Sequence, residues 1–154
     1  MTAARIGRAL FRHRGWIPVP GFVLIATLAH PSAASLALGA VLYALGAILR
    51  LWAVRHLGPE GRTRGDEVGP LALGGPYRWS RNPCYVGNLL LWSGLAAAAA
   101  APAGAVVPAL LGVHWRLVIA WEEERLTAVH GASYRAFAAR VPRWFAPGPR
   151  TPPA

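Results

Sequence analysis

The sequence contains no lysine, a single cysteine and few acidic residues. Of its 154 residues, 16 are basic, all of them arginine, and six are acidic, so the formal net charge is +10. The lone Cys84 permits neither an intramolecular disulfide nor a cysteine-based metal cluster. The five histidines lie far apart, without the spacing of paired helical ligands, so we predict no metal site.

Charge is also absent from two long segments of the chain. Residues 15–49 and 83–115 contain no Asp, Glu, Lys or Arg. Charged residues make up 14% of the chain, whereas a soluble domain carries about a quarter. A basic protein is attracted to nucleic acid, but here the arginines lie at the edges of apolar runs. We therefore predict a membrane protein with no nucleic-acid partner.

Four apolar segments are candidates for membrane spans: residues 16–29, 35–54, 85–101 and 104–121. A helix needs about 17 to 25 residues to cross a bilayer, so the last three qualify and the first is short. Pro102, between the third and fourth segments, is typical of a tight hairpin. The predicted fold class is all-α, a polytopic membrane protein with about four transmembrane helices and a cytoplasmic C-terminal helical segment.

The arginines also predict the orientation. They flank the N-terminus, the connection after the second segment and the tail after the fourth, whereas the other two connections are uncharged. The positive-inside rule then places both termini of this cell-membrane protein in the cytoplasm. A cleaved signal peptide over residues 1–35 is the alternative, because a basic start precedes an apolar stretch and small residues. Two prolines in that stretch and the even number of spans argue against it.

Two polar clusters flank the second half of the chain. The first is "GGPYRWSRNPCYVGN", residues 74–88, and the second is "WEEERLTAVHGASYRAFAARVPRW", residues 121–144. One lies just before the third predicted span and the other just after the fourth. A hairpin of these spans would make the clusters neighbours on the cytoplasmic side.

Each cluster has a simple structural interpretation. Asn82 and Pro83 suit the N-cap and first turn of a helix, and Arg81 suits a lipid anchor. A helix start and a lipid anchor do not explain the glycines and tyrosines of the first cluster. Glycine allows close approach of a ligand, and tyrosine offers a flat face with a polar tip. The acidic triplet beginning at Glu122 suits a solvated helix end, or a cationic ligand. Arg50 is interpreted as a snorkelling anchor.

The two clusters resemble the integral-membrane methyltransferases that include isoprenylcysteine carboxyl methyltransferases and phosphatidylethanolamine N-methyltransferases. The resemblance covers residues 74–144, about half of the chain. Asn82 replaces the usual histidine of the family, which removes a titratable imidazole but keeps a hydrogen-bonding group. The matching positions are Gly75, Pro76, Tyr77, Arg81, Pro83, Tyr85, Gly87, Glu122, Glu123, Leu126, Gly131, Tyr134, Val141 and Arg143.

The resemblance implies S-adenosylmethionine bound at the cytoplasmic face, between the hairpin and the C-terminal segment. Arg81, Glu122 and Glu123 are the implied catalytic residues. The implied cofactor-binding residues are Tyr77, Arg81, Asn82, Pro83, Tyr85, Gly87, Glu122, Glu123 and Tyr134. Residues 1–154 then form one domain, with an N-terminal hairpin and loop in 1–73, a catalytic half in 74–144 and a flexible tail in 145–154.

The implied function is methyl transfer to a lipidic or lipid-linked acceptor that enters from the bilayer. We expect carboxyl methylation of the isoprenylcysteine type, with phospholipid N-methylation as the alternative. Two less favoured hypotheses are a membrane reductase that uses NADPH and a non-enzymatic membrane scaffold. The acidic triplet argues against NADPH, because the phosphates of that cofactor attract basic residues.

Overall fold

The computed structural model describes residues 3–13, 15–58 and 68–145, and this part of the chain contains helices and no strands. The prediction of an all-α fold is confirmed. Of the tail predicted over residues 145–154, only Phe145 lies within the described residues. The helices are α1 (Ala3–Arg12), α2 (Pro18–Thr27), α3 (Ala33–Leu57), α4 (Pro83–Ala99) and α5 (Val106–Arg140), with short 3-10 helices η1 (Gly75–Arg78) and η2 (Pro102–Ala105).

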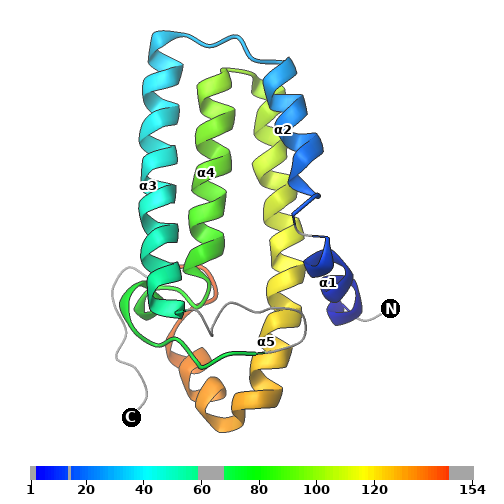
Figure 1. Cartoon of the computed structure of the whole chain (residues 1–154), viewed down its shortest axis with the longest axis vertical. Coiled ribbons are helices and arrows are strands. Elements are labelled where there is room, and N and C mark those ends of the chain that lie inside the picture. The colour runs from blue at the N-terminus through cyan, green and yellow to red at the C-terminus, as the bar shows by residue number, and fades with distance from the viewer. Residues whose placement is uncertain (1–2, 14, 59–67, 146–154) are drawn as a thin grey trace.

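Helices α2 to α5 lie side by side along the long axis, with α4 between α3 and α5 (Figure 1). The α2–α3 and α4–α5 connections, residues 28–32 and 100–105, lie at one end, which we call the uncharged end. Helix α1, residues 68–82 and residues 122–145 lie at the other, the basic end. The two polar clusters are therefore at the same end of the molecule, as the sequence predicted.

Glycines allow α3 and α4 to pack in close contact. A methyl group added to Gly94 of α4 would lie 2.7 Å from the backbone nitrogen of Tyr43 on α3. About two turns of α4 closer to the basic end, a methyl on Gly46 of α3 would lie 2.7 Å from the carbonyl oxygen of Gly87 on α4. Contacts between small residues of this kind are typical of helix pairs in membranes. Gly87, predicted to face a ligand, is instead buried against α3.

The starts of α3 and α4 are stabilised differently. Ser32 and Ser35 form a capping box at α3, each hydroxyl accepting a hydrogen bond from the backbone N–H of the other. Pro83 occupies the first turn of α4, as predicted. Asn82 stands at the N-cap position, as expected, but its side chain makes no capping hydrogen bond and donates to the Arg143 carbonyl instead.

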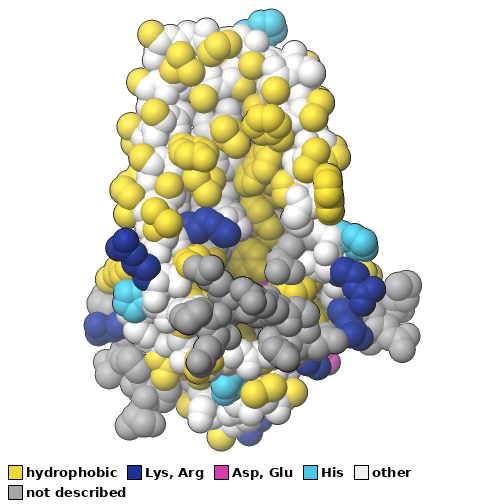
Figure 2. Space-filling view, viewed as in Figure 1, with side chains coloured by type: hydrophobic (Ala, Val, Ile, Leu, Met, Phe, Trp, Pro, Cys, Tyr) yellow, Lys and Arg dark blue, Asp and Glu magenta, His cyan; other side chains and the backbone are white. Residues whose placement is uncertain are grey.

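The outer surface of the helices is that of a membrane protein. Large apolar side chains along α3 are between 52% and 63% exposed, at Leu38, Val41, Leu45, Ile48 and Leu51. Figure 2 shows hydrophobic side chains over the upper part of the molecule and most basic side chains in a band below them. Two stretches in the described residues are long and apolar enough to cross a membrane, α3 and Pro102–Arg140. Helices α2 and α4 have 10 and 17 residues.

Helix α1 was not predicted from the sequence, where residues 3–12 counted only as a basic block. It packs against α5, with the Phe11 and Trp121 rings 4.8 Å apart and Gly7 against the backbone of Leu117. Helix α5 runs from its apolar part into the acidic cluster without a break and then turns sharply at Gly131, where φ is 51°. This turn brings the C-terminal segment back toward the start of α4.

Candidate active site

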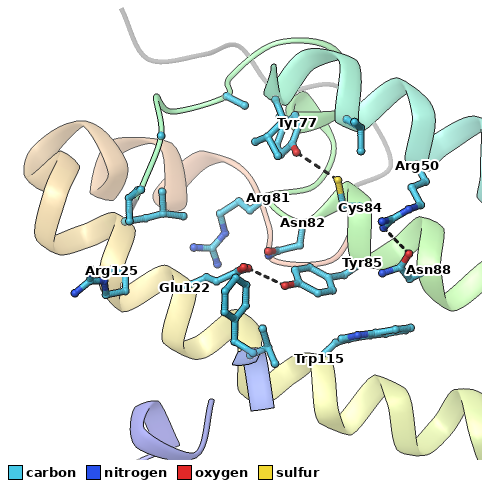
Figure 3. Close-up of a pocket in the computed structure, with 18 of the residues that line it drawn as sticks. Arg50, Tyr77, Arg81, Asn82, Cys84, Tyr85, Asn88, Trp115, Glu122 and Arg125 are labelled. Atoms are coloured by element: carbon cyan, nitrogen blue, oxygen red, sulfur yellow. Dashed lines mark hydrogen bonds between the residues drawn. The ribbon is translucent and has the colours of Figure 1, made fainter. Parts of the chain in front are cut away.

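A cavity of about 830 Å³ lies at the basic end, among α3, α4 and α5 (Figure 3). Residues 68–72 and the link between α1 and α2 complete its wall. This volume is within the range of small-molecule pockets, about 300 to 1,000 Å³. Both polar clusters contribute to the lining, so the cavity is the natural candidate for the site that the sequence predicted.

The three consecutive glutamates of α5 point in different directions, because successive residues of a helix are about 100° apart. Glu122 lines the cavity, and its Oε2 accepts a hydrogen bond of 3.0 Å from the hydroxyl of Tyr85 on α4. Glu123 is turned away from the cavity and is only 13% exposed. Glu124 is exposed to solvent. The triplet is therefore one cavity residue, one partly buried residue and one surface residue.

Glu123 connects two arginines from different segments. Arg143 donates to both of its carboxylate oxygens, from Nε at 3.2 Å and from Nη2 at 2.5 Å. Arg81 Nη1 lies 3.3 Å from Oε1 of the same carboxylate. The hydrogen bond to Glu123 raises the pKa of Arg143, so this side chain stays charged. Glu123 thus holds the C-terminal segment and the segment before α4 together at the edge of the site.

Arg81 has a second role, because its side chain also lines the cavity. Its Nε atom is buried and has no hydrogen-bond partner among the described residues. An unsatisfied buried N–H is costly unless a ligand or water accepts from it. Arg81 therefore contributes a guanidinium to the cavity wall while Glu123 pairs with its Nη1.

Asn82 secures the C-terminal segment from the α4 side. Its Nδ2 donates to the carbonyl oxygen of Arg143 at 3.0 Å, and the Ser80 hydroxyl donates to the same oxygen at 3.3 Å. The backbone N–H of Arg81 donates to the carbonyl of Pro142 at 3.0 Å. Asn82 acts here as a hydrogen-bond donor, a role that does not need a titratable side chain.

Aromatic side chains form much of the cavity wall. The Tyr85 and Trp115 rings lie 6.1 Å apart, and the Tyr134 and Phe137 rings 6.2 Å apart. Tyr77 is buried, its hydroxyl lies 3.7 Å from the sulfur of Cys84, and burial raises its pKa well above the usual value. Such a wall suits a flat, largely apolar group such as a purine.

The cavity gathers most, but not all, of the predicted site residues. Those that line it are Tyr77, Arg81, Asn82, Tyr85, Glu122 and Tyr134. Glu123 lies behind Arg81, and Pro83 and Gly87 are buried in helix packing. Lining residues that the sequence analysis missed are Arg50, Cys84, Asn88, Trp92, Trp115, Trp121 and Arg125. Asn88, a polar residue inside an apolar run, was an available signal.

Known proteins share the part of the chain that builds this cavity. The phospholipid methyltransferase family matches residues 34–133, from the start of α3 to the turn in α5. Phosphatidyl-N-methylethanolamine N-methyltransferase of Saccharomyces cerevisiae is 37% identical over 90 residues, which are 56% of this chain. These residues cover 44% of the yeast protein, so the chain spans less than half of that relative. No solved structure matches. The family match extends over more than half of the chain, and the chain therefore belongs to the phospholipid methyltransferase family.

Proposed function

We propose that this protein transfers a methyl group from S-adenosylmethionine to the amine of a phospholipid at the cytoplasmic face of the membrane. The observation that carries the proposal is the Tyr85–Glu122 pair, which places a carboxylate inside an aromatic cavity. The family and the yeast relative support this acceptor. They favour the alternative, phospholipid N-methylation, over the carboxyl methylation that we expected first.

We further propose that α2, α3, α4 and α5 all cross the bilayer, with the basic end in the cytoplasm. The exposed apolar side chains of α3 support this, as do Phe22 and Val23 of α2, both 53% exposed. Arginines at one end and none at the other agree with the positive-inside rule. Because α2 and α4 are short, we expect the bilayer to thin beside them.

The residues present fit the proposed methyl donor. When bound, S-adenosylmethionine supplies a methyl group on a positively charged sulfur. Arg81, whose guanidinium lines the cavity, suits the carboxylate of that molecule. Tyr134 and Phe137 offer aromatic, largely apolar surface for its adenine. Glu122 supplies negative charge in the cavity for its cationic groups.

Glu122 also explains why the acceptor is an amine. A protonated amine has no lone pair, so it must lose a proton before or during attack on the methyl group. The Glu122 carboxylate can accept that proton, and the Tyr85 hydroxyl that donates to Oε2 keeps the carboxylate in place. A carboxylate acceptor would be repelled by Glu122 at the same position. The apolar wall excludes water, and most of the remaining rate comes from alignment.

The proposal is tested first by binding to the protein purified in detergent. Calorimetry is expected to show micromolar binding of S-adenosylhomocysteine and none of NADPH. Binding of neither would overturn the enzymatic interpretation, and binding of NADPH alone would favour the reductase.

The acceptor is tested by transfer of labelled methyl groups to N-methylated phosphatidylethanolamine and to an isoprenylcysteine carboxylate. Glu122→Gln keeps an acceptor for Tyr85 but removes the base, so we expect kcat for the phospholipid to fall about 10²- to 10⁴-fold. Glu124→Gln, a matched change at the exposed neighbour, should leave kcat unchanged. Methylation of the carboxylate alone would refute the amine acceptor.

A further inference from the structure

Arg50 on α3 and Asn88 on α4 meet at the end of the cavity that lies deeper in the helix bundle (Figure 3). Arg50 Nη1 donates to Asn88 Oδ1 over 2.6 Å. Arg50 lies about two turns before the end of α3, or about 10 Å along its axis. The Arg50 side chain is exposed, as a snorkelling anchor would be, and its bond to Asn88 also directs it at α4 and the cavity.

The charge of Arg50 is not neutralised within the described part of the chain. Its recorded partner there is a neutral amide, and no carboxylate pairs with it. Arg81, which lines the same cavity, is by contrast paired with Glu123. A guanidinium has five N–H donors, and a cation at this depth is stabilised by an anionic partner. The structure thus presents an arginine whose charge is available to a ligand.

We propose that Arg50, oriented by Asn88, binds the phosphate of the acceptor phospholipid. This inference rests on the function proposed above and names the part of the acceptor that is recognised. A guanidinium binds phosphate oxygens through two parallel N–H donors. The neutral partner is essential, because Asn88 orients the arginine without competing for its charge.

The spacing of the two polar pairs matches the acceptor. Asn88 and Tyr85 both line the cavity and are three residues apart on α4, a rise of about 4.5 Å. Tyr85 bonds to Glu122, the proposed acceptor of the amine proton, and Asn88 bonds to Arg50. Two carbon atoms separate amine from phosphate in an ethanolamine headgroup, which fits a spacing of one helical turn.

The order of the groups also agrees with the orientation of a lipid in the cytoplasmic leaflet. From the basic end toward the bilayer centre, the chain places Glu122 first, then Arg50, then exposed apolar side chains of α3. A phospholipid presents amine, phosphate and acyl chains in the same order. In Figure 2 apolar side chains occupy the recess above the basic band, where the acyl chains would lie.

The competing explanation is that Arg50 only ties α3 to α4. The two helices are already in backbone contact through Gly46 and Gly87 at this level, so the hydrogen bond adds little to their association. Asn88→Asp separates the two explanations. It replaces the amide by a carboxylate of the same shape. The carboxylate would form an ion pair with Arg50, which strengthens the link between the helices but competes with a bound phosphate.

The experiment compares two acceptors in wild type, Arg50→Gln, Asn88→Asp and the control Arg55→Gln. Arg55 is an exposed arginine of the same helix that does not line the cavity. One acceptor is N-methylated phosphatidylethanolamine, and the other is a lipid amine with the same acyl chains and no phosphate. Initial rates at saturating S-adenosylmethionine give KM and kcat separately, and thermal unfolding in detergent checks the fold.

We expect Arg50→Gln and Asn88→Asp each to raise KM for the phospholipid about ten- to a hundredfold, the effect of losing a charged hydrogen bond. KM for the phosphate-free amine should change by less than about twofold, and Arg55→Gln should resemble wild type. Equal losses on both acceptors, or an unchanged KM for the phospholipid in Asn88→Asp, would overturn the assignment.

Lipid retention gives a readout that does not depend on methyl transfer. In native mass spectrometry, wild type should retain the phospholipid in preference to diacylglycerol, and Arg50→Gln should lose this preference. If no lipid is methylated but the preference is present and lost in Arg50→Gln, the proposed function fails and the phosphate site stands. Millimolar inorganic phosphate should displace the phospholipid only weakly. Complete displacement would assign the site to free phosphate and overturn the lipid assignment.

Discussion

The two ends of the molecule are held together by different interactions. At the uncharged end, the chains meet through backbone atoms and small side chains. A methyl on Gly39 would lie 2.6 Å from the carbonyl of Gly94, and Ser35 donates to the carbonyl of Ala98 at 3.1 Å. The backbone N–H of His30 donates to the carbonyl of Ala99 at 2.8 Å. No carboxylate or guanidinium takes part in these contacts.

At the basic end, charged and polar side chains connect segments that are far apart in the sequence. Glu123 pairs with Arg81 and Arg143, and Asn82 donates to the backbone of the C-terminal segment. Tight packing of small residues thus joins the helices at the uncharged end, while a polar network positions the cavity at the basic end. The first region should be sensitive to added volume, and the second to lost charge or lost donors.

The largest loss of stability is expected from added volume at the uncharged end. Gly94→Leu places atoms where Tyr43 of α3 already lies, so the two helices must separate. We expect a loss of about 3 kcal/mol, measured as a lower midpoint of thermal unfolding in detergent. Gly112→Ala is the control, because its methyl would be an ordinary 3.5 Å from Leu89. Equal midpoints for wild type and Gly94→Leu would contradict the packing described for this end.

An intermediate effect is expected from removing the charge of Glu123. Glu123→Gln leaves Arg81 and Arg143 without their carboxylate. We expect a loss of about 2 kcal/mol, less than for a fully buried pair because Arg143 is 35% exposed. Affinity for S-adenosylhomocysteine should fall about tenfold, because Arg81 is no longer held in position to donate a charged hydrogen bond to the carboxylate of the ligand. Calorimetry checks the affinity and thermal unfolding the stability.

The control for this charge change is Glu124→Gln, at an exposed residue of the same helix. It should shift neither the unfolding midpoint nor the affinity. Similar losses in Glu123→Gln and Glu124→Gln would mean that net charge, and not the ion pair, stabilises the basic end.

The smallest effect is expected at Asn82. Asn82→Ala removes one donor to the carbonyl of Arg143, to which Ser80 still donates. We expect a loss of about 1 kcal/mol in thermal unfolding. Asn82→His keeps an N–H donor at this position and should lose less. A larger loss in the histidine variant would show that the chain has adapted to the shorter side chain.

Much of the fold was predictable because the bilayer limits both the length and the composition of a span. The segment predicted over residues 35–54 corresponds to α3, Ala33–Leu57, and the predicted hairpin turn at Pro102 is present as η2. Charge separation predicted which connections share an end. These features depend on local sequence and on the solvent, so no tertiary contact was needed to infer them.

The different roles of Glu122 and Glu123 were not predictable from the motif. Adjacent helical residues are distinguished only by the rotation of the helix about its axis. For α5 that rotation is set by packing, including Trp121 against Phe11 of the unpredicted α1. The packing of Gly87 against α3 was missed for a related reason, because a glycine required for helix packing and one required near a ligand look the same in a sequence.

The lack of lysine, the scarcity of acidic residues and the absence of charge from two long segments determined a helical membrane protein with a basic end, because a bilayer excludes unpaired charge regardless of fold. The pairing of polar residues was decided only by the tertiary structure. Arg50 and Asn88 are 38 positions apart, and Tyr85 and Glu122 are 37 apart. Their meeting depends on the register in which α3 and α5 pack on α4. That register is set by glycine contacts and aromatic packing between helices, which no local stretch of the sequence contains.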